Sequence, residues 1–151
     1  MKLIKSVRQI NKIILHCTAT PEGRDIDAET ITKWHKNRGW LTNGYHYIVK
    51  LDGTIEEGRS VHMVGAHTNG QNTGSLGVVY VGGCDDNMKP KDTRTQEQDT
   101  ALTNLLTALL EKYPNATIHG HNEFAPKACP SFNVQEEYSF LINPKVEEEN
   151  E

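Results

Sequence analysis

Short apolar runs that suit β-strands alternate along this chain with segments of helical periodicity, and this alternation restricts the fold more than any other feature. Strands are expected at residues 13–16, 45–51, 54–57, 76–81 and 116–119, and helices at 27–36, 96–112 and 134–141. Such an order is typical of an α/β domain built in layers. With 151 residues the chain can bury one core, so a single domain is expected.

Local signals mark the ends of several of these elements. Asp27 can cap the helix that follows it, and Gly39 stands where that helix should stop. Asp52 and Gly53 form the residue pair of a two-residue turn, which predicts a hairpin. Residues 58–75 are expected to form a long loop. The helix at 96–112 carries a leucine stripe that should pack in the core: Leu102, Leu105, Leu106, Leu109 and Leu110.

Charge and composition indicate where the folded domain should begin and end. The net charge of -4 gives no general attraction to nucleic acid, and no direct nucleic-acid contact is expected. Residues 1–12 are locally basic and are expected to be a solvated, partly mobile segment, with Lys2, Lys5, Arg8 and Lys12. The folded domain should span residues 13–142. Residues 143–151 form an acidic tail that should be disordered.

The cysteines and the hydropathy indicate a cellular compartment. Three cysteines are an odd number, which argues against a disulfide framework and for a reducing environment. No apolar run approaches the roughly 20 residues of a membrane helix, and the N-terminus lacks the apolar stretch of a signal peptide. We expect a monomer in the cytoplasm, with no membrane span.

The segment 119–130 brings a histidine, a lysine and a cysteine close together in the sequence, as His121, Lys127 and Cys129. Imidazole and thiolate are ligands that zinc prefers, and a catalytic zinc takes three protein ligands and leaves one position open. His16, at the end of an apolar strand, is the best third candidate. Each residue alone is more often a buried or hydrogen-bonded side chain, and no short C-x-x-C spacing is present. The spacing therefore leaves both a metal site and ordinary packing open.

A family resemblance favours the metal site. From about residue 13 to about residue 140 the chain resembles the zinc-dependent N-acetylmuramoyl-L-alanine amidases, and the motif at 125–132 is the most specific part of the match. The other motifs lie in the same order, at residues 16–20, 34–36, 39–40, 44–47, 52–54, 58–59 and 82–83. This resemblance implies a central mixed β-sheet of about five strands flanked by helices, and peptidoglycan as the substrate.

The resemblance also implies roles for individual residues. His16, His121 and Cys129 would bind Zn²⁺, and Tyr45 and Lys127 would be the catalytic pair beside it. The remaining histidines receive weaker expectations. His67, in the long loop, is expected to contact substrate, and His119 is a candidate to support a ligand. His35 and His62 should be ordinary surface or half-buried histidines. Strand alternation places Tyr45 and His46 on opposite faces unless a bulge intervenes.

The activity implied is hydrolysis of the amide bond between N-acetylmuramic acid and L-alanine, as in host lysis by a phage. The small phage enzymes that the chain resembles also bind and inhibit their phage's RNA polymerase, and the basic N-terminal segment is a candidate contact. Such an enzyme, made in the host cytoplasm, would reach the wall only after membrane permeabilisation.

Two other functions stay open at this point. One is a peptidoglycan-binding module that does not cut, although binders of this fold lack the ligand cysteine, so Cys129 argues against it. The other is a hydrolase with Cys129 as nucleophile and His121 as base. Pro130 and the lack of an orienting acid disfavour that second arrangement.

Overall fold

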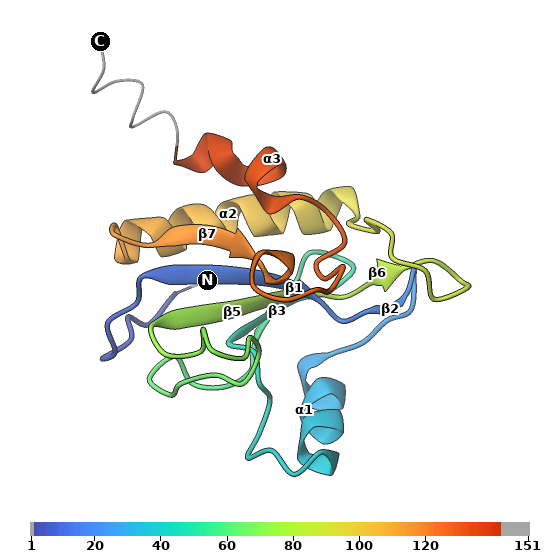
Figure 1. The fold of residues 1–151 in the computed structure, drawn as a ribbon, viewed down its shortest axis with the longest axis horizontal. Helices are drawn as coiled ribbons and strands as arrows, with labels where there is room; N and C mark the ends of the chain where they lie inside the picture. Colours follow the sequence, from blue (N-terminus) through green and yellow to red (C-terminus); the bar gives the residue numbers. More distant parts are fainter. Residues whose placement is uncertain (1, 143–151) are drawn as a thin grey trace.

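A strand from the start of the chain lies inside the sheet. The computed structural model describes residues 2–142, and the predicted acidic tail at 143–151 lies outside them. β1 (Lys12–Cys17) pairs in parallel with β5 (Ser75–Tyr80) on one side and with β7 (Thr117–Gly120) on the other. β3 (Tyr47–Val49) runs parallel to β5 and antiparallel to β4 (Ile55–Glu57). The resulting sheet is mixed and has five strands in the order β4-β3-β5-β1-β7, which confirms the predicted architecture (Figure 1).

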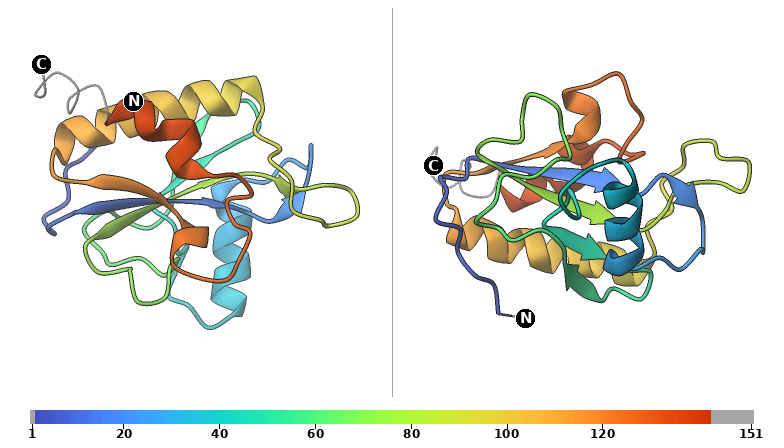
Figure 2. Two further views of the ribbon diagram at one scale, coloured as in Figure 1. Left: turned by 45° about the horizontal axis from the view of Figure 1, so that its top comes forward. Right: turned by 90° about the horizontal axis from the view of Figure 1, so that it is seen from below.

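Helices cover both faces of this sheet. α2 (Gln96–Lys112) and α3 (Val134–Tyr138) lie on one side and α1 (Ala28–Asn37) lies on the other (Figure 1). Seen from below, α1 crosses near the carboxyl ends of the strands (Figure 2). Alternate strand residues point to the two sides. Ile13 and Leu15 join the larger core with the leucines of α2, whereas Val79 joins a smaller core with Ile31 of α1. All five leucines of the predicted stripe are buried.

Three elements are too short to show periodicity in the sequence and were not predicted. β2 (Thr20–Pro21) and β6 (Gly83–Cys84) form a separate two-stranded sheet beyond the carboxyl ends of β1 and β5. A 3₁₀ turn, η1 (His121–Glu123), follows β7. The helix predicted at 134–141 is divided into α3 and a second 3₁₀ turn, η2 (Ser139–Leu141). Within residues 2–142, no helix combines the length and the apolar character that a membrane span needs.

The predicted caps are confirmed, and the predicted turn is corrected. The Asp27 side chain accepts a hydrogen bond from the Thr30 backbone N–H at the start of α1. Between β3 and β4, however, the Lys50 N–H donates to the Thr54 carbonyl, so the loop holds three residues rather than the two predicted. Gly53 is its last residue and has a φ of +87°. A left-handed residue at this position is typical of three-residue hairpin loops.

The N-terminal segment is packed against the domain, so the prediction of a solvated segment is wrong. Leu3, Ser6 and Ile10 are buried, and the Ser6 N–H donates to the Tyr113 hydroxyl over 2.8 Å. Arg8 also turns inward, and its guanidinium donates to the carbonyls of Val61 and Ser75. The small and apolar residues that are buried alternate with the basic residues in this segment. Lys2 and Lys5 do remain exposed.

The leucine stripe gives a prediction for stability. Leu106 is fully buried in the larger core. Leu106→Ala should lower the free energy of unfolding by about 2–5 kcal/mol, because the lost apolar contact is only partly offset by collapse of the cavity. Asn104→Ala, at an exposed position of the same helix, should change it by less than about 0.5 kcal/mol. Urea unfolding of both variants tests this, and equal effects would contradict the packing described here.

Candidate active site

Three groups that can bind a metal meet at the carboxyl ends of the parallel strands. His16 is near the end of β1, and His121 comes directly after the neighbouring β7. Cys129 is carried back to the same edge by the loop that follows η1. One ring nitrogen from each histidine and the Cys129 sulfur all lie within 4.8 Å of one another. Adjacent parallel strands end at the same edge, which explains how residues so far apart in the sequence come together.

Short contacts hold this cluster. His16 Nδ1 lies 3.7 Å from the Cys129 sulfur, and the rings of His16 and His121 have centroids 4.7 Å apart. The Cys17 backbone N–H donates to the Cys129 sulfur over 3.2 Å. The Cys17 side chain belongs to the larger core, as alternation along β1 predicts. His16 therefore faces the cluster while its neighbour anchors the strand.

The electrostatics of the cluster favour neutral imidazoles. Burial lowers the pKa of His16 well below its ordinary value, and His67, His121 and Lys127 add to this effect. Burial and Lys127 also lower the pKa of His121. A hydrogen bond to Cys17 and burial raise the pKa of the Cys129 thiol, whereas the Cys17 N–H and Lys127 act in the opposite direction. Neutral imidazoles offer lone pairs to a metal ion, and the Cys129 thiol would bind a metal as the thiolate, releasing its proton to the solvent.

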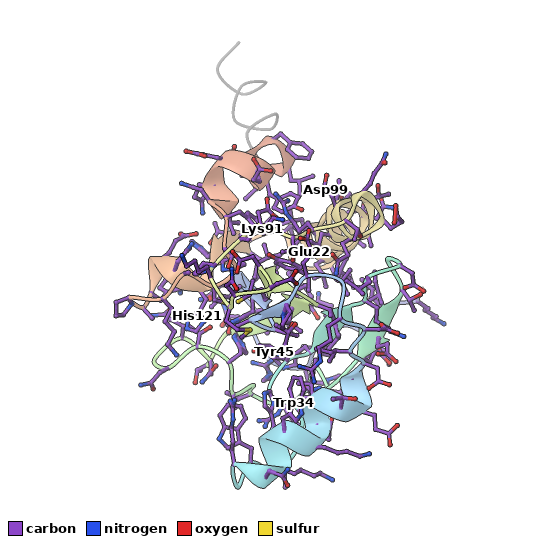
Figure 3. All side chains as sticks on the ribbon, turned by 90° about the vertical axis from the view of Figure 1, so that its right-hand side faces the viewer. Glu22, Trp34, Tyr45, Lys91, Asp99 and His121 are labelled. Atoms are coloured by element: carbon purple, nitrogen blue, oxygen red, sulfur yellow. The ribbon has the colours of Figure 1, made fainter. Side chains whose placement is uncertain are left out.

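Tyr45 lies directly beside the cluster. Its ring centroid is 5.1 Å from that of His16. In the view of Figure 3, the Tyr45 label lies between those of His121 and of Trp34 in α1. Burial raises the pKa of Tyr45, with smaller contributions from Cys129 and Cys17, so its hydroxyl stays protonated. His46 has other surroundings, as predicted. Its ring accepts a hydrogen bond from the Gly77 N–H and contacts the Met63 carbonyl.

A cleft of about 600 Å³ opens next to the cluster. The residues that line it include His121, Lys127, Trp40, Asn69 and Phe124, together with the residues around His67. Lys127 is exposed, so its ammonium group is available to a ligand in the cleft. A substrate that occupies this cleft would therefore meet the histidines and a free positive charge together.

The remaining histidines occupy distinct places. His67 lines the cleft, and its Nδ1 also lies 2.9 Å from His16 Nε2. His119 pairs instead with Glu123 and Thr117. His62 is exposed, as predicted. The prediction for His35 is wrong: the side chain is buried and accepts a hydrogen bond from the Gly44 N–H, while its ring contacts Trp40 and Tyr45.

Sequence reasoning missed the polar residues that hold His67. Thr68 and Ser75 both contact its ring, and the Asn72 side chain accepts hydrogen bonds from the His67 and Thr68 backbone N–H groups. Residues of these types fill most loops, so their composition carries no specific signal. The position of Thr68 immediately after His67 was the only clue in the sequence.

Comparison with known proteins identifies relatives over most of the chain. The family described as N-acetylmuramoyl-L-alanine amidase matches residues 6–132. The endolysin of Escherichia phage T7 is 44% identical over 131 residues, which cover 87% of each chain. Peptidoglycan-recognition protein SC2 of Drosophila melanogaster is 28% identical over 122 residues, 78% of this chain and 64% of that protein. The structure of the N-acetylmuramoyl-L-alanine amidase LysC from Clostridium intestinale superposes with a TM-score of 0.77 at 27% identity, covering 93% of this chain and 94% of that one.

Proposed function

Because the chain belongs to the N-acetylmuramoyl-L-alanine amidase family, we propose that it hydrolyses the amide bond between N-acetylmuramic acid and L-alanine with a zinc ion held by His16, His121 and Cys129. The observation that carries this proposal is the convergence of the three ligating atoms within 4.8 Å beside a cleft. Two imidazoles and one thiolate suit zinc and leave a fourth position for a reactant. The peptidoglycan-recognition protein among the relatives supports the same polymer as the ligand of the cleft.

The chemistry that a bound zinc supplies is Lewis acidity toward the amide carbonyl and toward water. The Cys129 thiolate would neutralise part of the metal's charge and so weaken its pull on the carbonyl oxygen. A second positively charged group is therefore needed to stabilise the oxyanion. Lys127 meets that need, because its ammonium group lines the cleft beside His121. A positive charge placed where the oxyanion develops stabilises the transition state more than the ground state.

Tyr45 is suited to donate a hydrogen bond during the reaction. Its raised pKa keeps the phenol protonated through the neutral range, so it acts as a donor and not as a base. Its ring centroid lies 5.1 Å from that of His16, so the side chain is next to one of the proposed ligands. We assign it to orienting the attacking water or to holding the oxyanion opposite Lys127. The Cys17 N–H has a separate task, because it holds the sulfur of Cys129.

The product of the reaction tests this function. Digestion of peptidoglycan should release stem peptides with a new free L-alanine amino terminus and leave the glycan strands intact. A glycosidase needs two carboxylates about 5–9.5 Å apart, and among the described residues that line the cleft there is none. Mass spectrometry of the digest gives the answer. New reducing sugar ends without new amino termini would contradict the assignment, and binding without any product would indicate a non-catalytic peptidoglycan module.

A second role concerns the N-terminal segment. We propose that the protein also binds and inhibits the RNA polymerase of its own phage, as its resemblance to the small phage amidases implies. Lys2 and Lys5 are exposed, and they flank Ile4, of which 58% is exposed. Arg8 is not part of this contact, because its guanidinium is turned inward. The role would act in the host cytoplasm, before membrane permeabilisation gives the protein access to the wall.

Charge reversal tests this second role. Lys2→Glu with Lys5→Glu should weaken inhibition of transcription and leave amidase turnover unchanged, because both lysines lie outside the cleft and attract an acidic partner electrostatically. Lys127→Ala should show the opposite pattern. The measurement is a transcription assay with the cognate polymerase, run beside an amidase assay. If wild-type protein neither binds nor inhibits at micromolar concentration, this role is excluded and the amidase proposal stands alone.

A further inference from the structure

His67 does more in this structure than line the cleft, and we infer that it is a positioning residue which directs the Nδ1 lone pair of His16 toward the metal. The inference rests on the zinc site proposed above. His67 Nδ1 lies 2.9 Å from His16 Nε2, on the far side of the His16 ring from Cys129. Ligating histidines commonly use their second ring nitrogen in such a hydrogen bond, which fixes both tautomer and orientation.

A chain of hydrogen bonds determines where the protons lie. Ser75 Oγ donates to the Asn72 backbone carbonyl, which can only accept. The Ser75 oxygen is then free to accept from His67 Nε2, 3.3 Å away, so His67 carries its proton on Nε2. Its Nδ1 must accept, and His16 must therefore donate from Nε2. Nδ1 of His16 is left without a proton, and it is the nitrogen that faces the Cys129 sulfur.

Thr68 is compatible with this arrangement. Its hydroxyl lies 2.9 Å from His67 Nδ1 and 3.2 Å from His16 Nε2. A hydroxyl can either donate or accept, so Thr68 can donate to His67 Nδ1 or accept from His16 Nε2, and neither role changes the position of the His16 proton. When His67 is replaced, the Thr68 oxygen can still accept a hydrogen bond from His16 Nε2, so part of the interaction is retained.

The His67 ring has little freedom to move. It is 9% exposed and packs against two glycines. A Cβ atom at Gly77 would lie 2.6 Å from the ring, and one at Gly65 would lie 2.7 Å from it. The Asn72 side chain holds the backbone at His67 and Thr68. The ring is thus fixed before any ligand arrives, as expected of a residue that orients another.

Two substitutions distinguish the role of His67 as a hydrogen-bond acceptor from the space that its side chain fills. His67→Leu removes the acceptor, and His67→Asn puts an amide oxygen where Nδ1 stood. Zinc affinity, measured by competition with a chromophoric chelator, should fall about 10–100-fold in His67→Leu and stay within about threefold of wild type in His67→Asn. His62→Leu, at an exposed histidine outside the cluster, is the matched control and should bind zinc as wild type does. Equal losses in Leu and Asn variants would overturn the inference.

A pure substrate contact would give a different result. Both His67 variants would then raise KM while zinc affinity stayed unchanged, and that outcome also overturns the inference. Long-range ¹H–¹⁵N correlation of the histidine rings in the metal-free wild-type protein supplies a readout that needs neither zinc nor activity. The proton of His16 should be on Nε2, and a proton on Nδ1 would refute the hydrogen-bond chain from Ser75 through His67 to His16. If the wild-type protein bound no zinc at all, the proposed metal site would fail, and this spectrum would still decide whether that hydrogen-bond chain exists.

Discussion

Cys129→Ser should lose zinc and, with it, amidase activity, and this is the largest effect that we expect from a single substitution. A neutral hydroxyl is a poor substitute for a thiolate as a zinc ligand. The sulfur also accepts the Cys17 N–H, so the replacement disturbs the orientation of the group as well as its charge. The zinc content of the dialysed protein and its turnover on peptidoglycan should both fall to background. The fold should persist, because Cys129 lies at the edge of the larger core and not inside it.

Cys84→Ser is the matched control for this prediction. Cys84 is a buried free cysteine of β6, and it is not among the three residues whose ligating atoms converge. It should keep about one zinc per chain and near wild-type activity. If Cys129→Ser kept both its zinc and its activity, Cys129 would not be a ligand. A cysteine-nucleophile mechanism would instead show full zinc content in Cys129→Ser with no turnover.

Lys127→Ala should retain zinc and lose turnover by about 10²-fold or more, because it removes a charge that acts on the transition state. The side chain is exposed and lines the cleft, so its loss should not affect stability. The decrease should appear in kcat more than in KM. Lys33→Ala, at an exposed position of α1, is the control for loss of a surface charge and should leave kcat unchanged.

Tyr45→Phe tests the other member of this pair. Loss of the hydroxyl should lower kcat by a similar factor, about 10²-fold, while the ring keeps its contact with His16. Zinc content and the unfolding transition should match wild type. Wild-type turnover in either variant, with zinc retained, would show that the second electrophile is another group.

Much of the fold follows from the sequence because its signals are periodic and local. The leucine stripe of α2 and the apolar runs of β1 and β5 each repeat long enough to identify an element. β2 and β6, with two residues each, cannot show a period. The packing of residues 2–12 depends on Tyr113 and on the loop around Val61, which are far away in the sequence. A local pattern cannot indicate such contacts.

The candidate site divides in the same way. His16, His121 and Cys129 could be predicted because their motifs resemble those of a family and because strand ends meet at one edge. The hydrogen bond from His16 to His67 could not be predicted. It joins a strand residue to a loop residue 51 positions away, and it depends on the orientation of both rings. The sequence placed His67 in the long loop, and only the structure shows which of its neighbours it contacts.

Zinc content measured together with activity tests the central claim most directly. Purified protein should contain about one zinc per chain. Removal of the metal with a chelator should abolish release of stem peptides, and addition of one equivalent of zinc should restore it. Protein that is free of metal, as measured by mass spectrometry, and that still releases free L-alanine amino termini at the original rate would contradict the account.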